Sequence, residues 1–253
     1  MLNHENGSSF NKIIMFHSAR SGSTVLGDLL GQHPQIRWDG EIYAPPTQKP
    51  SPRLLNYLIK DPIKLLSLRM RFAHKKYYGF ETQFIHLDIK KIALTDFVAA
   101  LKQMGFAHFI ILKRKNYLRL IVSALIAQQA SQWHQPAGQQ ARLNPATINL
   151  EQVFGPNGLS LLGTLEYVEE RFQAVEQLLA DQKVLQLTYE GHISNNPLLG
   201  YQEICRFLEV EPDSTVSVRY SKTNPFSLGE LIANFGEVEQ ALQGTQFAWM
   251  LDE

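Results

Sequence analysis

The chain has 253 residues, of which 44% are hydrophobic and 19% charged, and this is long enough to bury the core of one α/β domain. Lysine plus arginine equals aspartate plus glutamate at 24 each, so no basic excess indicates a nucleic-acid partner, and any anion site has to be a local cluster. A single cysteine excludes an intramolecular disulfide, and because neither a secretory signal nor an apolar run of membrane-spanning length is found, we expect a cytoplasmic protein.

The first elements of the chain predict a strand followed by a helix. Residues 1–11 are polar and predict a disordered lead-in to a single domain of residues 12–253. The short apolar run KIIMF, residues 12–16, predicts a buried strand. Residues 23–32 then have apolar side chains at the spacing of one helix face.

The turn between this strand and this helix has the composition of a phosphate-binding loop. It reads Ser21-Gly22-Ser23-Thr24, and in a strand–turn–helix unit the backbone N–H groups and the positive end of the helix dipole converge on such a turn. The P-loop of ATP- and GTP-using enzymes, G-x-x-x-x-G-K-[ST], has a lysine after its last glycine. No lysine follows Gly22 here, and Arg20 precedes the turn instead. The segment therefore predicts an anion site with a displaced cation.

A basic region follows. Residues 44–53 hold four prolines and predict a loop, and residues 54–78 are rich in lysine and arginine and partly helical. Such a stretch is most often the solvated face of a helix. The alternative is a docking surface for an anionic substrate or for a membrane.

The remaining chain alternates between predicted strands and helices. We expect strands at residues 108–112 and 183–189, and helices at residues 96–104, 117–134, 161–180 and 197–208, with a polar excursion at 135–150 and a mostly helical tail from 224 to 253. This alternation predicts a single α/β domain with a central parallel sheet flanked by helices.

A second candidate anion site follows the most hydrophobic predicted strand. That strand ends in Lys113-Arg114-Lys115, and Ser123 lies nine residues after Arg114 on the next helix. Ligands of open parallel sheets collect at the carboxyl ends of the strands, where Arg114 can make a bidentate contact with a phosphate. The alternative is a solvated charge run with a helical serine that bonds its own backbone.

Together, SARSGST and RKNYLRLIVS resemble motifs of the 3′-phosphoadenosine-5′-phosphosulfate (PAPS)-dependent sulfotransferase family. In that family the first loop cradles the 5′-phosphosulfate, which implies this role for Arg20 and the turn at 21–24. A strand-end arginine and a serine on the next helix hold the 3′-phosphate, which implies this role for Arg114 and Ser123. Because the arginine-to-serine spacing is one residue longer than in the common cytosolic pattern, Lys115 is the alternative to Arg114. The resemblance implies a P-loop NTPase-like sulfotransferase fold.

Two later stretches resemble bacterial sulfotransferases of the nodulation-factor and trehalose-sulfating type. They are LTYEGHISNNPLLGYQEICRFLEV and NPFSLGELIANFGEVEQALQGTQFAWML, so the resemblance spans roughly residues 12–250. The glycine-rich C-terminal motif of cytosolic sulfotransferases is absent, and RYSKTNPF replaces it, which brings Lys222 near the nucleotide unless it is a surface lysine. Related bacterial enzymes tend to read Gly-Phe-Lys before the middle strands, whereas this chain has Gly79-Phe80-Glu81, so no function is carried onto Glu81.

The resemblance also implies a catalytic base. Glu41 in Gly40-Glu41 occupies the place of the catalytic carboxylate of the trehalose-sulfating relatives. The alternatives are that Glu41 only faces water or that it binds a sugar hydroxyl. His134 and His86 are the reserve candidates for the base. His17 is expected to be structural. Arg20 and the N–H groups of the turn are expected to stabilise the leaving phosphate, and no metal is expected.

The resulting hypothesis is a sulfotransferase that moves the sulfuryl group from PAPS to a hydroxyl of a carbohydrate or glycolipid. One rival is a P-loop kinase-like phosphotransferase, which predicts dependence on ATP and Mg²⁺. The other is a non-catalytic nucleotide-binding relative. We expect a small-molecule, glycan or glycolipid acceptor and no nucleic acid, and leave peripheral membrane contact open. The sequence names neither the acceptor nor the oligomeric state.

Overall fold

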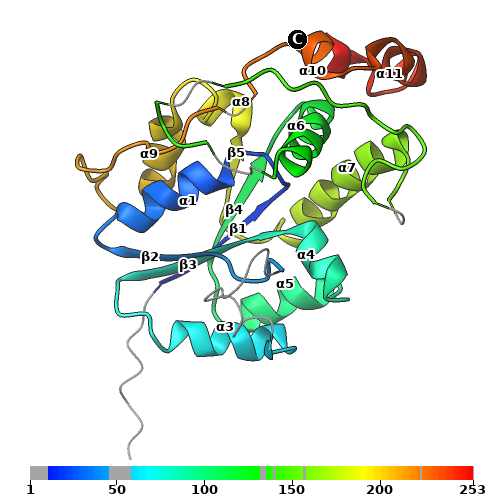
Figure 1. Cartoon of the computed structure of the whole chain (residues 1–253). Helices are drawn as coiled ribbons and strands as arrows, with labels where there is room; N and C mark the ends of the chain where they lie inside the picture. The colour runs from blue at the N-terminus through cyan, green and yellow to red at the C-terminus, as the bar shows by residue number, and fades with distance from the viewer. Residues whose placement is uncertain are drawn as a thin grey trace, which may run out of the picture.

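A computed structural model of the protein describes residues 11–45, 58–131, 135–138, 141–155, 158–222 and 224–252. Five strands form an all-parallel sheet in the order β2-β3-β1-β4-β5, and helices flank it in a single α/β domain (Figure 1). The strands are β1 (Asn11–His17), β2 (Ile36–Glu41), β3 (Tyr77–Gln83), β4 (His108–Lys113) and β5 (Val184–Thr188). The predicted fold class is therefore confirmed at this level.

The central strand β1 is buried on both faces. The side chains from Ile13 to His17 are fully buried, and β1 pairs with β3 on one side and with β4 on the other. A strand covered by helices on both faces has an unbroken apolar run, which is why KIIMF predicts it from sequence. The strand begins at Asn11, which pairs with Tyr77, so the predicted lead-in is wrong for this residue. Residues 1–10 lie outside the described part of the chain.

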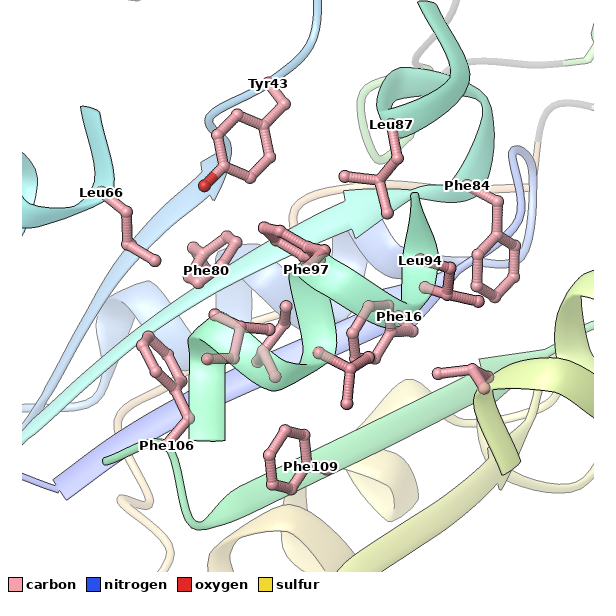
Figure 2. Close-up of a cluster of buried hydrophobic side chains, with 14 of the residues drawn as sticks. Phe16, Tyr43, Leu66, Phe80, Phe84, Leu87, Leu94, Phe97, Phe106 and Phe109 are labelled. Carbon is pink, nitrogen blue, oxygen red and sulfur yellow. The ribbon is translucent and has the colours of Figure 1, made fainter. Parts of the chain in front are cut away.

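Alternate residues of β1 belong to two different hydrophobic cores. Ile14 and Phe16 pack against α3 (Pro62–Met70), α4 (Phe84–Ile89), α5 (Leu94–Gln103) and α7 (Leu161–Leu178). This core is rich in aromatic rings (Figure 2), and the ring centroids of Tyr43 and Phe97 lie 5.6 Å apart.

The opposite face of the sheet is covered by two helices. Ile13 and Met15 pack against α1 (Ser23–Gln32) and α9 (Pro197–Phe207), which lie together on one side of the sheet in Figure 1. Cys205 of α9 is fully buried in this core.

A third core joins the C-terminal tail to the rest of the domain. The helix α6 (Tyr117–Gln129) packs with α10 (Leu228–Leu231), α11 (Phe235–Leu242) and the 3₁₀ helix η1 (Ala248–Leu251). The tail is thus helical in short segments. The helix predicted to reach His134 ends at Gln129, because Ser131 adopts a left-handed backbone conformation with φ of 49°; His134 itself lies outside the described residues.

The chain connections diverge at the carboxyl ends of β1 and β4. From β1 the chain runs through α1 to the edge strand β2, whereas from β4 it runs through α6 and α7 to β5 at the opposite edge. Adjacent strands whose connections leave in opposite directions open a crevice at their carboxyl ends, where ligands of open α/β sheets bind. The fold therefore places the loop after β1 and the loop after β4 on the two sides of one crevice.

The contact between Gly79 and Trp38 predicts that a larger side chain at position 79 would destabilise the fold. Gly79 of β3 pairs with Trp38 of β2, and a Cβ on Gly79 would lie 2.4 Å from the indole ring. We expect Gly79→Ala to lower the free energy of unfolding by about 1–3 kcal/mol, as overpacking does.

Chemical denaturation measures this loss. Gly31→Ala is the matched control, because nothing lies within 4 Å of a Cβ there and the residue is helical. The control should be neutral or stabilising. A Gly79→Ala protein as stable as the control would contradict the predicted clash.

Candidate functional site

The loop between β1 and α1 folds through two left-handed residues. Arg20 has φ of 57° and Gly22, the N-cap of α1, has φ of 88°. A Cβ on Gly22 would also lie 2.9 Å from Ile193 and 3.2 Å from Tyr189, so glycine is required there by backbone and by space. The buried Ser21 donates its hydroxyl hydrogen to the carbonyl oxygen of Ser18 at 2.8 Å. The side chain of Ser21 thus shapes the loop from within.

A cavity of about 290 Å³ opens beside this loop, at the crevice between β1 and β4. Most of the sequence-predicted binding residues line it. They are Arg20, Gly22, Ser23, Thr24, Arg114, Ser123 and Lys222. The two anion sites predicted from distant parts of the sequence therefore share one cavity.

Two guanidinium groups, those of the half-buried Arg20 and the buried Arg114, form the cationic wall of the cavity. Arg20 Nε donates to Ser123 Oγ at 2.9 Å, and Arg114 Nη1 donates to the carbonyl oxygen of Arg20 at 3.1 Å. Burial, and next the like charge of Arg114, lower the pKa of Arg20 to about 10, so Arg20 stays charged at neutral pH. Two like charges held together away from water favour binding of an anion between or beside them.

The side chain of Arg114 is held by an aromatic ring. Its guanidinium carbon lies 4.5 Å from the ring centroid of Tyr189, the first residue of α8 (Tyr189–His192). This distance is typical of a cation–π contact, which helps to hold the guanidinium group in place. Ser123 also accepts a hydrogen bond from Asn224 Nδ2 at 3.1 Å, so its hydroxyl joins α6 to the C-terminal segment.

Lys115 takes a different position from Arg114. Its side chain is exposed and is not among the residues that line the cavity, whereas Arg114 is 9% exposed and lines it. The backbone N–H of Lys115 donates to both carboxylate oxygens of Glu190, at 3.1 and 3.0 Å. Glu190 thus holds the loop after β4, a role that the sequence does not predict.

A short strap brings Lys222 to the cavity. Pro136 and Tyr220 form an antiparallel bridge, and Ser221 N donates to the carbonyl oxygen of Gln135 at 3.0 Å. Tyr220, Ser221 and Lys222 line the cavity together with Gln135. This pairing joins the predicted polar excursion to the segment that replaces the glycine-rich motif.

Glu41 lies outside this cavity, in a second cluster of polar side chains. His17 Nε2 lies 3.6 Å from Glu41 Oε1 and 3.8 Å from Glu81 Oε2, and Gln83 Nε2 donates to Glu41 Oε1 at 2.7 Å. We call these four residues, His17, Glu41, Glu81 and Gln83, the carboxylate cluster. They lie at or near the carboxyl ends of β1, β2 and β3.

The two reserve bases differ in what the structure describes of them. His86 is buried in α4, and His134 lies outside the described residues. His17, which is expected to be structural, has its Nε2 3.6 Å from Glu41 Oε1. Sequence reasoning missed Glu81, since it departs from the Gly-Phe-Lys pattern, and its side chain is 7% exposed.

The basic region at residues 54–78 is described from Leu58 onward, and its cations differ in their surroundings. The Lys64 side chain is 82% exposed, whereas Lys75 Nζ donates to the carbonyl oxygens of His33 and Ile36. Part of this region thus faces solvent and part binds backbone carbonyls.

Comparison with known proteins gives no match to a family model and none to a curated protein. In the described part of the chain, no group of three or more His, Cys, Asp or Glu side chains is arranged to hold a metal ion. No helix among these residues has the length and hydropathy needed to cross a membrane.

The cationic wall predicts binding of a simple anion. Replacing chloride by sulfate at constant ionic strength should raise the Tm of the wild type more than that of Arg114→Gln, because the variant lacks one of the two guanidinium groups. Each kcal/mol of added stability corresponds to about 2–4 °C for a chain of this size.

Lys115→Gln is the matched control, since it removes one exposed cation outside the cavity. Its response to sulfate should equal that of the wild type, and the general stabilising effect of sulfate cancels in the comparison. The measurement is a thermal melt of all three proteins. Equal responses in all three would exclude Arg114 from an anion site.

Proposed function

We propose that the chain is a PAPS-dependent sulfotransferase with a P-loop NTPase-like sulfotransferase fold. It transfers the sulfuryl group to a hydroxyl of a carbohydrate or glycolipid. The observation that carries this proposal is the shared cavity, in which Arg20 and Ser123 are in contact at 2.9 Å although 103 residues separate them. A nucleotide with phosphates at its 5′ and 3′ positions needs two anion sites within one cavity.

The lining of the cavity suits the rest of a nucleotide as well. Apolar and aromatic side chains lie beside the cationic wall, among them Val25, Tyr189, Ile193 and Val218. A cavity of about 290 Å³ is near the lower end of the range for small-molecule sites, about 300–1,000 Å³. The combination of a charged wall and an apolar wall supports a ligand with phosphates and a base.

The types of cation favour sulfuryl over phosphoryl transfer. A P-loop kinase uses a lysine after the last glycine of its loop. Here the cations around the cavity are arginines before the turn and at the end of β4, with Lys222 from the strap. A sulfuryl group carries less charge than a γ-phosphoryl group, so arginines and backbone N–H groups at the loop suffice to stabilise the leaving phosphate.

In the proposed reaction the acceptor oxygen forms a bond to sulfur while the bond between sulfur and the 5′-phosphate oxygen breaks. The electron pair of that bond remains on 3′-phosphoadenosine-5′-phosphate (PAP). In this proposal Arg20 and the N–H groups of the turn stabilise this charge, while Arg114 and Ser123 hold the 3′-phosphate. The proton of the acceptor hydroxyl passes to Glu41, whose side chain is 23% exposed and therefore open to a ligand on the β2 side of the loop.

The nucleotide preference tests the proposal directly. PAP should raise the Tm of the protein without added metal, because its two phosphates fit the two anion sites. ATP with Mg²⁺ should raise it much less. Thermal melts with each nucleotide measure the difference, and the reverse ranking would support the P-loop kinase instead.

The role of Glu41 is tested by Glu41→Gln. The variant should bind PAP as the wild type does, since Glu41 lies outside the cavity, and should lose transfer by a factor of about 10²–10⁴, as expected for a general base. Transfer is measured with labelled PAPS and the acceptor found for the wild type by screening carbohydrates and glycolipids.

Glu203→Gln, an exposed carboxylate on α9, is the control and should keep both properties. A fully active Glu41→Gln enzyme would assign the base to a histidine such as His86 or His134. A wild type that binds PAP but transfers to no acceptor would support the non-catalytic alternative.

A further inference from the structure

The buried imidazole of His17 has a defined tautomer. His17 is 0% exposed, and its Nδ1 lies 3.0 Å from the carbonyl oxygen of Ser18. A carbonyl oxygen only accepts hydrogen bonds, so Nδ1 carries the hydrogen atom. In the neutral ring the other nitrogen, Nε2, then holds a lone pair.

This lone pair faces two carboxylates. Nε2 lies 3.6 Å from Glu41 and 3.8 Å from Glu81, distances too long for hydrogen bonds, and no described residue makes a hydrogen bond with Nε2. A buried polar atom without a partner calls for an explanation, because burial without a hydrogen bond is costly. One proton placed on Nε2 would turn both contacts into favourable ion pairs.

The two neighbours of His17 in the sheet carry no charge. In the sheet it is flanked by Gln83 of β3 and by the apolar Leu112 of β4. Among the described residues, the carboxylates within 4.0 Å of its Nε2 are those of Glu41 from β2 and Glu81 from β3. Burial lowers the pKa of His17, and the charge of Glu41 opposes this effect only in part. The resting imidazole is thus neutral near pH 7.

We propose that His17 Nε2 receives the proton that Glu41 takes from the acceptor hydroxyl, and that Glu81 stabilises the resulting imidazolium. This inference rests on the proposed function for the source of the proton. The acceptor O–H hydrogen moves to Glu41, and from Glu41 it moves to Nε2, so Glu41 returns to its carboxylate form. Because His17 acts through Glu41, it is a positioning residue and not a catalytic one.

Glu81, which departs from the Gly-Phe-Lys pattern, has a role in this proton path. A lysine at position 81 would place a second cation beside His17 and oppose its protonation. Glu81 does the opposite, because a buried carboxylate favours the imidazolium. The cluster therefore gains one positive charge between two negative ones when the proton arrives.

The tautomer and the titration of His17 test the inference without any turnover. Protein labelled with ¹⁵N in its histidines is titrated by NMR, and the His17 signals are assigned with His17→Asn, whose amide can keep the hydrogen bond to Ser18. At pH 7 the wild type should show the Nδ1–H neutral tautomer. As the pH falls, His17 should take up a proton on Nε2 before the protein unfolds.

Carboxylate variants test the partners. Glu41→Gln and Glu81→Gln should each move the titration of His17 to lower pH, because each removes a negative charge from the imidazolium. Glu203→Gln, distant on the surface, should leave it unchanged. An Nε2–H tautomer, an imidazolium at pH 7, a ring that stays neutral until unfolding, or a titration that neither variant moves would overturn the inference.

Failure of this inference is distinguishable from failure of the proposed function. If the wild type binds PAP but His17 gives one of the contradicting NMR results, only the proposed proton path is refuted. If the wild type does not bind PAP, the proposed function is refuted, whatever the protonation state of the imidazole.

Discussion

The site depends on the hydrogen bond between Arg114 and the carbonyl oxygen of Arg20. This bond joins the loop after β1 to the end of β4 at 3.1 Å and holds a residue whose backbone is left-handed. A non-glycine residue in that conformation costs free energy and needs support from its surroundings. With Arg20 held there, its side chain reaches Ser123 on α6, and the two strand ends present a single cationic wall.

Charge is separated around the loop although the whole chain has no net charge. Arg20, Arg114 and Lys222 line the cavity between the ends of β1 and β4, and the carboxylates of Glu41 and Glu81 come from β2 and β3. This arrangement suits a reaction in which negative charge develops on a leaving phosphate while a proton leaves the acceptor on the other side. Because the net charge is summed over the whole chain, the balanced composition reveals neither cluster.

The parts of the fold that sequence predicts are those with local patterns. The unbroken apolar runs of β1 and β4 and the turn at Gly22 are local, as are the caps and faces of the long helices. The strands β2 and β3 have no such pattern, because only Ile36 is buried in β2, and β3 contains Gly79 and the polar Glu81. The contact of His17 with Glu41 depends on the strand order, and the strap depends on pairing of residues 135–138 with 219–221; both are non-local and cannot be predicted from local patterns.

The central claim is that one cavity holds two phosphates of one nucleotide, and calorimetric titration with PAP and with adenosine 5′-monophosphate tests it most directly. The two ligands differ only in the 3′-phosphate. A charge-assisted hydrogen bond is worth about 1.5–3 kcal/mol, so the wild type should bind PAP roughly 10- to 150-fold more tightly. In Arg114→Gln this ratio should fall toward one, while Lys115→Gln keeps it. Equal affinities of the wild type for the two ligands, or a ratio that Arg114→Gln leaves unchanged, would contradict the account.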